Sequence, residues 1–427
     1  MKPSLEPPIF DLAIIGAGAA GLTTAIAAAR LARDQKKALN ILLLDSKPKP
    51  GAKILMSGGT RCNVTNELVQ PADFEGGPKH FIKHVLEAFT SEQTMQWFKE
   101  LGIELILEPT GKYFPTTHSA KTVLEALLNE VNRLGVKLLT GTRITAVQKS
   151  GELFELKSDD PNFVVHSRTV VLTTGGLSHP GTGSDGTGYT FAKHFGHHII
   201  PTFPGLTPLL TEDPDWKSLS GVSLEAELSF YLNGKKEHSS KGALLFTHFG
   251  FSGPAALDIS RHFASAEKEE RPEIKANFLP AQNEDSFKIK WDQAQKKTAE
   301  KLIKNFLAQE FSLPSRFVEV FLRKIGLDSM STIGSCSGEK RKSLSHSLFY
   351  YPLEVTGVYG YQKAEVTAGG VDLKEVKVQT MESKQVRGLY FAGEILDTDG
   401  RIGGFNFQWA WSTGTIAGRG AARSLMA

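Results

Sequence analysis

Five small residues near the N-terminus have the type and spacing needed to bind a phosphate group. They lie between an apolar strand expected at 10–15 and an Ala-rich helix expected at 22–31. In the pattern G-x-G-x-x-G, the glycines permit a tight turn, close approach of the backbone to a pyrophosphate, and close packing of helix on strand. The N–H groups at the start of the helix then point at the phosphates. The turn consists of Gly16, Gly18, Ala19, Ala20 and Gly21.

An acidic residue follows at the position that a nucleotide ribose requires. Asp45 ends a second strand expected at 40–44, and Ser46 is the next residue. A carboxylate at this strand end can accept hydrogen bonds from an adenosine ribose. Strand, glycine turn, helix, strand and acid together form one βαβ unit, so the sequence predicts a site for an adenine dinucleotide that includes Asp45 and Ser46.

A second G-x-G-x-x-G, at 181–186, lacks this context. It follows His179 and Pro180 instead of a strand, so its glycines are not placed to aim N–H groups at phosphate, and we expect a loop. Just upstream, an apolar strand expected at 170–172 runs into Thr174 and Gly175. A strand that ends in such small residues can pass under a bound nucleotide.

The C-terminal region carries groups suited to a flavin ring. A strand expected at 388–392 ends in Gly393 and Glu394, and Gly404 precedes a helix expected from about Phe407. A carboxylate at a strand end can bond the ribityl chain. The positive end of a helix behind a glycine turn suits the pyrimidine edge of the flavin, which becomes anionic on reduction. The two ends of the chain thus predict one flavin–adenine dinucleotide site.

Composition restricts the remaining choices. The 427 residues include 49 Lys and Arg against 46 Asp and Glu, a net charge of +3 that is too small for non-specific nucleic-acid binding, so we expect no nucleic-acid partner. The two cysteines form no local pair, and the start of the chain lacks the order of a signal peptide, which favours the cytoplasm. The uncharged run at 12–29 is rich in Ala and Gly, so we read a strand and helix there and no membrane segment.

The pattern of residue types changes twice along the chain. Strand and glycine motifs fill 1–199 and return over 351–427. Between them, 200–282 has strand patterns and 283–350 is a Lys- and Glu-rich helical stretch. We therefore predict an α/β protein whose discontinuous Rossmann-like nucleotide-binding domain is interrupted by an inserted module at 200–350.

Six motifs resemble one family, the BaiN-like NAD(P)/FAD-dependent oxidoreductases, which include aminoacetone oxidases and a bile-acid steroid reductase. The resemblance spans nearly the whole chain. It implies FAD as cofactor, a FAD-binding domain of the glutathione-reductase type, and an insert made of a small β-barrel and a helical piece. The motifs lie at 16–21, 57–63, 173–176, 246–254, 367–371 and 393–406.

The resemblance and the patterns together give further candidate cofactor-binding residues, which are Lys53, Ser57, Gly58, Arg61, Asn63, Val147, Asn406 and Phe407. The chain departs from the family at Ala52, where Arg is usual, at Thr60, where Gly is usual, and at Asp45, where Glu is usual. Loss of that Arg removes a partner for the pyrophosphate, although Lys53 and Arg61 remain.

His248 is the candidate catalytic residue, because in this family its segment faces the flavin cleft. Cys62 lies beside Arg61 but has no resolving partner, so we expect a packing residue. The basic runs around 296–304 and 340–342 are interspersed with acids and read as solvated faces without an aromatic platform. No metal-ligand spacing occurs in the sequence.

The sequence predicts a FAD-dependent oxidoreductase, and of three readings the first is the expected one and the other two are alternatives. NAD(P)H could reduce the flavin, which then reduces an activated double bond of a small molecule. An amine could reduce the flavin, which O₂ reoxidises. The third reading is a non-catalytic FAD-binding scaffold or sensor. Neither the substrate nor the oligomeric state can be read from the sequence.

Overall fold

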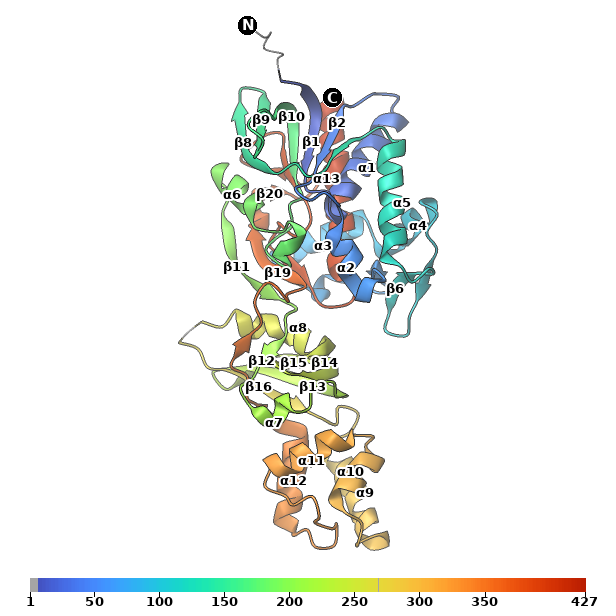
Figure 1. Cartoon of the computed structure of the whole chain (residues 1–427), viewed down its shortest axis with the longest axis vertical. Helices are drawn as coiled ribbons and strands as arrows, with labels where there is room; N and C mark the ends of the chain where they lie inside the picture. Colours follow the sequence, from blue (N-terminus) through green and yellow to red (C-terminus); the bar gives the residue numbers. More distant parts are fainter. Residues whose placement is uncertain (1–6, 268) are drawn as a thin grey trace. The chain divides into compact units, whose positions relative to one another are not determined.

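The computed structural model describes residues 7–267 and 269–427, which fold into two compact units (Figure 1). Unit 1 comprises 7–202 and Val366–Ala427, so the two ends of the chain build it together, and unit 2 is Phe203–Glu365. Unit 2 extends beyond 350, where the sequence placed the return to the first domain. The reason is that β17 (Tyr351–Leu353) and β18 (Gly357–Val358) pair with strands of unit 2.

A parallel sheet forms the centre of unit 1. Its strands are β22 (Leu389–Phe391), β10 (Val164–Leu172), β1 (Ile9–Ile15), β2 (Ile41–Leu44) and β7 (Lys137–Leu139), in that order. Buried apolar side chains predominate in all of these strands except β7 at the edge, as expected of a parallel sheet with both faces covered. Antiparallel strands extend it: β8 (Ile144–Ser150), β9 (Leu153–Ser158), β20 (Val376–Lys377) and β21 (Glu382–Ser383).

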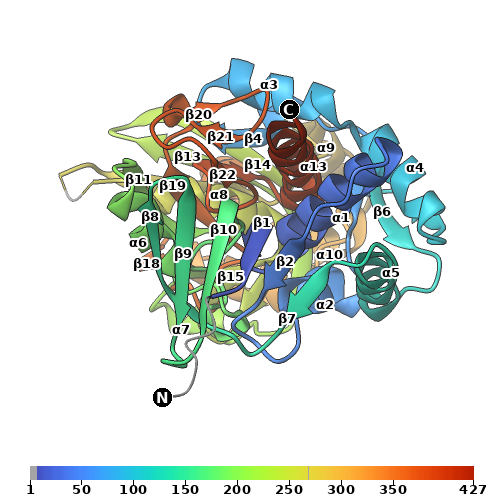
Figure 2. The same cartoon turned by 90° about the horizontal axis from the view of Figure 1, so that it is seen from above.

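Two helices from opposite ends of the chain pack together in unit 1, and Figure 2 shows them side by side. They are α1 (Ala19–Asp34) and α13 (Phe405–Met426). A Cβ at Gly414 of α13 would lie 2.7 Å from the Ala20 carbonyl oxygen, and one at Gly418 would lie 2.3 Å from that of Thr24. Glycine is therefore required at both positions. This packing brings the start of α13 into the same unit as the glycine turn.

Short elements complete unit 1. Its helices are α2 (Ala52–Thr60), α3 (Lys79–Ala88), α4 (Ser91–Glu100), α5 (Ala120–Arg133), α6 (Thr187–His194), η1 (Pro71–Asp73), η2 (Pro180–Thr182) and η3 (Leu373–Glu375). Small sheets pair β3 (Thr65–Asn66), β6 (Lys112–Pro115) and β5 (Leu105–Leu107); β23 (Thr398–Gly400) and β4 (Phe74–Gly76); and β11 (Ile199–Gly205) and β19 (Val366–Val371).

Unit 2 contains an antiparallel sheet and a group of helices. The strands run in the order β17, β16 (Pro272–Asn277), β13 (Ser223–Leu232), β14 (Lys235–Thr247), β15 (Gly250–Ser252), β12 (Leu209–Leu210) and β18. The helices are α7 (Pro214–Lys217), α8 (Gly253–Ala264), α9 (Glu284–Lys297), α10 (Ile303–Glu310), α11 (Ser315–Lys324) and α12 (Gly338–Tyr350). Trp216 of α7 joins the two parts, because its ring lies 5.5 Å from that of Phe246 and 6.2 Å from that of Phe317 on α11.

The part of the chain that the structure describes has no helix long and apolar enough to cross a membrane. The uncharged run at 12–29 is divided between β1 and α1, as the sequence predicted.

Candidate FAD site

The glycine turn is closed toward the protein and open on one side. A Cβ at Gly21 would lie 1.8 Å from the Gly16 carbonyl oxygen, and one at Gly16, where φ is +108°, would lie 2.5 Å from that of Thr173. A Cβ at Gly18 would meet no heavy atom within 4 Å. Gly18 is the N-cap residue of α1, so the open space lies at the helix end that attracts anions.

Asp45 fixes the turn from the neighbouring strand end. Its carboxylate accepts hydrogen bonds of 2.8 Å from the backbone N–H groups of Ala17 and Lys47, one on each oxygen. Burial raises the pKa of Asp45 above its usual value, although both N–H groups and the charge of Lys47 act in the opposite direction. A carboxylate oxygen has two lone pairs, so each oxygen of Asp45 keeps one for a ribose hydroxyl.

The end of β10 closes the turn from behind. The Thr173 hydroxyl donates to the carbonyl oxygens of Ile15 and Gly16, at 3.0 and 2.7 Å. The next hydroxyl, Thr174 Oγ1, is buried and has no hydrogen-bond partner among the described residues. Gly175 then turns the chain with φ of +70°. This segment offers a buried polar atom that a bound molecule could satisfy.

The second glycine pattern is a loop, as expected. Pro180–Thr182 forms the short helix η2, and Gly186 is the N-cap residue of α6. A Cβ at Gly183 would lie 3.0 Å from Ser46 Oγ, so this loop lies against the residue next to Asp45. The loop therefore borders the expected ribose position without forming a phosphate turn of its own.

The motif at 57–63 has an unusual backbone. Helix α2 includes the first part of this motif and kinks at Ser57, where ψ is 150°. Gly58, Gly59 and Thr60 follow with φ of 55°, 65° and 70°, in the left-handed region. A non-glycine residue at positive φ is strained, and such strain gathers at functional sites. The turn ends at Asn63, whose Oδ1 is buried and lacks a partner among the described residues.

Helix α13 begins beside Asn63. Gly404, its N-cap residue, has φ of 94°, and a Cβ there would lie 2.8 Å from Asn63 Oδ1. The Asn406 side chain bonds both the N–H and the carbonyl oxygen of Gly400 at 2.8 Å, which holds the turn before the helix. Asn406 therefore supports the turn, and the Phe407 ring stacks on that of Trp411 at 5.4 Å.

The carboxylate of Glu394 joins three separate segments. Its Oε2 lies 2.7 Å from Lys53 Nζ of α2, and its Oε1 accepts hydrogen bonds from Ser178 Oγ at 2.8 Å and from Thr367 N at 3.0 Å. Lys53 Nζ also donates to Ser178 Oγ at 2.7 Å. Burial acts to raise the pKa of Glu394, but Lys53 and the hydrogen bonds outweigh it, so the pKa lies below its ordinary value. Gly393, just before it, donates its N–H to Thr413 Oγ1 of α13 at 3.0 Å.

Sequence reasoning missed Ser178 and Thr367, the two partners of Glu394. Each lies far from Glu394 along the chain, and no local pattern marks a residue that bonds a distant carboxylate. Thr367 does fall within the family motif at 367–371, which was the available signal.

Neither cation expected near the pyrophosphate is free. Lys53 is paired with Glu394, and Arg61 is paired with Glu108 at 2.5 Å while lying 4.1 Å above the centre of the Phe114 ring. Both Lys53 and Arg61 already have an acidic partner. Neither is therefore an unpaired cation that could take the place of the Arg that is usual in this family at position 52. The N–H groups at the start of α1 are left as the donors available to a phosphate.

Two candidate residues lie outside this group. Val147 is 2% exposed, lies opposite Leu156 in the β8–β9 pairing and packs in the core, so its side chain is not available to a ligand. His248 belongs to unit 2, where it is exposed in the turn between β14 and β15, and its ring contacts that of Phe249.

Cys62 is a packing residue. It is fully buried, and burial raises its pKa to about 12, with a hydrogen bond from Ser57 acting in the opposite direction. Only the thiolate reacts readily with electrophiles. We expect iodoacetamide at pH 8 to label the half-buried Cys336 in the native protein and to leave Cys62 unlabelled until unfolding, as measured by peptide mass spectrometry. Rapid labelling of native Cys62 would contradict this assignment.

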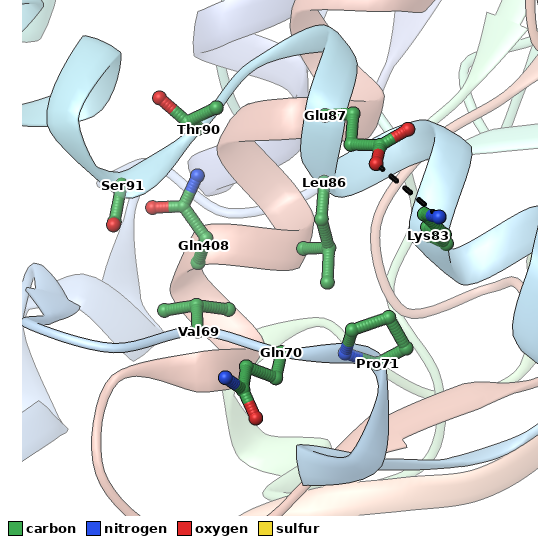
Figure 3. A pocket seen from close by; sticks show the side chains of 9 residues that line it. All are labelled: Val69, Gln70, Pro71, Lys83, Leu86, Glu87, Thr90, Ser91 and Gln408. Carbon is green, nitrogen blue, oxygen red and sulfur yellow. Dashed lines mark ion pairs between the residues drawn. The ribbon is translucent and has the colours of Figure 1, made fainter.

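A cavity of about 250 Å³ elsewhere in unit 1 is lined by an amide and an ion pair that already have partners (Figure 3). The Gln408 amide accepts from Thr65 Oγ1 at 2.7 Å and donates to the Phe89 carbonyl oxygen and Ser412 Oγ at 3.0 Å. At the rim, Lys83 and Glu87 form an ion pair of 3.7 Å. Among the described residues there is also no group of three His, Cys, Asp or Glu side chains that could hold a metal.

The residues of unit 1 fit FAD. The space at Gly18 and the start of α1 suit a pyrophosphate, and the carboxylate of Asp45 suits a ribose. The unpartnered oxygens of Thr174 and Asn63 and the start of α13 offer groups for the remainder of the molecule. Fold and site together define a Rossmann-type flavoprotein.

Comparison with known proteins identifies the family. Residues 10–420 match the model of the HI0933-like protein Rossmann domain, and the chain belongs to this family of FAD-dependent oxidoreductases. It is 35% identical to the ribosomal RNA dihydrouridine synthase of Haemophilus influenzae, covering 94% of this chain and 95% of the relative. The Escherichia coli protein of that name is also 35% identical, with 95% and 96% covered. The 3-dehydro-bile acid delta(4,6)-reductase of Clostridium scindens is 32% identical, with 96% and 98% covered.

Proposed function

We propose that the protein reduces a carbon–carbon double bond conjugated to a carbonyl group, with FAD bound in unit 1 and NAD(P)H as the electron donor. The observation that carries this proposal is the chemistry shared by the relatives' names. Forming dihydrouridine saturates the uracil C5=C6 bond, which is conjugated to the C4 carbonyl. A delta(4,6)-reductase acting on a 3-oxo steroid saturates bonds conjugated to the C3 carbonyl. Both reactions add a hydride to the electron-poor carbon and a proton to its neighbour.

The side chains of unit 1 bind and orient the cofactor in this proposal. FAD supplies hydride transfer when it is bound. The start of α1 holds the phosphates, Asp45 holds the ribose, and Glu394 keeps Lys53 and Ser178 in place beside the strand end. The start of α13 supplies oriented N–H groups that favour negative charge. His248 stays a candidate catalytic residue.

We also propose the finer architecture that the family resemblance implies. Unit 1 would be a discontinuous FAD domain of the glutathione-reductase type, and the sheet and helices of unit 2 would correspond to the inserted β-barrel and helical piece. The parallel sheet with its glycine turn and the antiparallel sheet of unit 2 support this correspondence.

Between the two kinds of substrate, we favour a uracil base in RNA. The two relatives named for ribosomal RNA come from different organisms, and each is 35% identical to this chain over nearly its full length. The steroid reductase, at 32%, is the second candidate. This proposal reverses the expectation that nucleic acid is a poor partner, which rested on the net charge of the whole chain.

Anaerobic mixing tests the electron donor. We expect NADPH or NADH to remove the oxidised-flavin colour of the FAD-loaded protein within seconds, and we expect free FAD to stay coloured under the same conditions. If neither nucleotide bleaches the flavin but a primary amine does, the protein is an oxidase. If no donor bleaches it, the protein is a scaffold or sensor. Either result contradicts the proposal.

Addition of an acceptor to the reduced protein tests the substrate. We expect ribosomal RNA from a strain that lacks this protein to restore the flavin colour and to gain dihydrouridine, as measured by nucleoside mass spectrometry. Return of the flavin colour with androst-4-ene-3,17-dione, but not with RNA, would favour the steroid as the substrate. If neither compound brings back the flavin colour, the proposed class of acceptor is contradicted.

A further inference from the structure

One exposed stripe of α12 combines a cation with two aromatic rings. Lys342, His346 and Tyr350 follow one another at intervals of four residues, so they lie on one face of the helix. All three are exposed, and the buried Leu344 and Leu348 of α12 lie on the opposite face. The rings of His346 and Tyr350 are 5.2 Å apart with 34° between their planes, and Tyr350 is 47% exposed. No aromatic platform was expected beside the basic runs, and the structure places these two exposed rings on the helix that carries the run at 340–342.

Unpaired ammonium groups surround the start of this helix. Arg341 of α12 pairs with Asp292 of α9 at 2.8 Å, while Phe287 contacts Phe349 at 6.4 Å between ring centres. The two helices are therefore antiparallel, and the end of α9 lies beside the start of α12; both are visible in the helical part of Figure 1. Three lysines at these helix ends, together called the lysine cluster, are exposed and form no ion pair with any described residue. They are Lys296, Lys297 and Lys340.

Within unit 2, basic residues outnumber acidic residues in this helical part. Residues 283–350 contain 12 Lys and Arg against 8 Asp and Glu, whereas the whole of unit 2 contains 21 of each. A local excess of this kind attracts a polyanion even though the chain as a whole is close to neutral. Two exposed aromatic rings in contact are a second favourable feature, since each ring offers a flat surface on which a base can stack.

We propose that the lysine cluster and the stripe Lys342–His346–Tyr350 bind a single-stranded segment of RNA. Bases stack on His346 and Tyr350, while Lys342 and the lysine cluster contact the phosphates. This inference rests on the proposed function, because it assigns the surface that holds an RNA substrate. A membrane surface shares the preference for lysines, but it does not need two exposed rings one helical turn apart, so RNA fits better.

Fluorescence anisotropy with a fluorescein-labelled 20-nucleotide oligouridylate tests the surface in the full-length, FAD-loaded protein. We expect His346→Ala/Tyr350→Ala to raise the dissociation constant by about thirtyfold or more, since each lost stacking contact weakens binding about fivefold or more. The single variant Tyr350→Phe keeps the aromatic ring and leaves His346 unchanged, so it should bind the oligouridylate as the wild type does. Because all these side chains are exposed, the variants should melt at the wild-type temperature, which differential scanning fluorimetry checks.

Salt dependence separates the phosphate contacts from the stacking contacts. Each phosphate contact to a single strand contributes about 0.7 to the slope of log K against log salt concentration. We expect Lys296→Ala/Lys297→Ala/Lys340→Ala to reduce the slope by about 2, and the aromatic variant to leave the slope unchanged. The matched control removes the same charge from β14 of the same unit, as Lys235→Ala/Lys236→Ala/Lys241→Ala, and should bind as the wild type does.

Three outcomes would overturn the proposal. The first is equal binding by the wild type and the aromatic variant. The second is an equal effect of the cluster and control variants. The third is tighter binding to phosphatidylglycerol vesicles than to the oligonucleotide through the same residues, which would make this a membrane-binding surface. All of these leave the proposed reduction intact, whereas failure of NAD(P)H to reduce the flavin contradicts the proposed function and leaves the binding result standing.

Discussion

Gly18→Val should yield a folded protein that is purified without FAD. The backbone at Gly18 has φ of −81° and ψ of −166°, which any residue can adopt, and a Cβ there meets no protein atom within 4 Å. The added side chain would instead occupy the space at the start of α1 that suits the pyrophosphate. We expect visible flavin absorbance to fall below a tenth of the wild-type value per protein, with the far-UV circular dichroism spectrum unchanged.

Two other glycine variants make this result specific. Gly338→Val places valine in the first turn of α12, where a Cβ also meets nothing within 4 Å, and should keep its FAD. Gly21→Ala should fail differently, because its Cβ would lie 1.8 Å from the Gly16 carbonyl oxygen, so the fold itself is lost or destabilised. Stoichiometric FAD in purified Gly18→Val would show that the cofactor does not use this turn.

The βαβ unit was predictable because two of its glycines have a steric reason that can be read from spacing. Gly16 and Gly21 are required by the close approach of strand and helix, and the strand, turn and helix lie within one short segment. The return of the C-terminus to the same unit was also predictable, since Gly404 precedes a helix as the pattern indicated. Such features depend on neighbours in the sequence.

The partners of charged side chains were not predictable. Lys53 and Arg61 were expected at the pyrophosphate, but Lys53 pairs with Glu394, a residue more than 300 positions away, and Arg61 pairs with Glu108. A charge selects its partner through the tertiary fold, which spacing does not show. The limit of unit 2 was misplaced for a similar reason, because β17 and β18 pair with distant strands.

The aromatic stripe of α12 could have been found from sequence. Lys342, His346 and Tyr350 have the spacing of one helix face, and the sequence already predicted a helix there. It was missed because the basic run at 340–342 was considered without the residues one and two turns later. Only the exposure of the rings and the 5.2 Å between them needed the structure.

Glu394→Ala should weaken FAD binding by about 10- to 150-fold, which corresponds to about 1.5 to 3 kcal/mol for one charge-assisted hydrogen bond. Three protein donors already bond this carboxylate, so it has room for about one more, such as a ribityl hydroxyl. The variant should also melt at a lower temperature, because the ammonium group of Lys53, whose side chain is 24% exposed, loses its counter-charge. Titration of apoprotein with FAD and a thermal melt measure the two effects, and the exposed Glu300→Ala is the control that should change neither.

The pH dependence of the melt checks the ion pair. The folded pKa of Glu394 lies below the ordinary value of 4.5, so its contribution to stability is fully present above that value and is lost as the pH falls through the lowered pKa. The difference in melting temperature between wild type and Glu394→Gln should therefore be present at pH 7 and shrink below pH 4.5. A difference independent of pH would mean that the charge of Glu394 contributes nothing to the fold.

A double-mutant cycle decides how Glu394 acts on the cofactor. If Glu394 only holds Lys53 in place, then Glu394→Gln and Lys53→Met remove the same interaction, and the double variant should bind FAD as weakly as either single variant. If the carboxylate bonds FAD directly, the two losses should add, because Lys53→Met leaves that bond intact. We expect partial additivity, since Glu394 both pairs with Lys53 and retains acceptor capacity. If both single variants bind FAD with the wild-type affinity, Glu394 is not part of the FAD site. That result would also contradict the functional argument that the C-terminal segment of unit 1 reaches the cofactor.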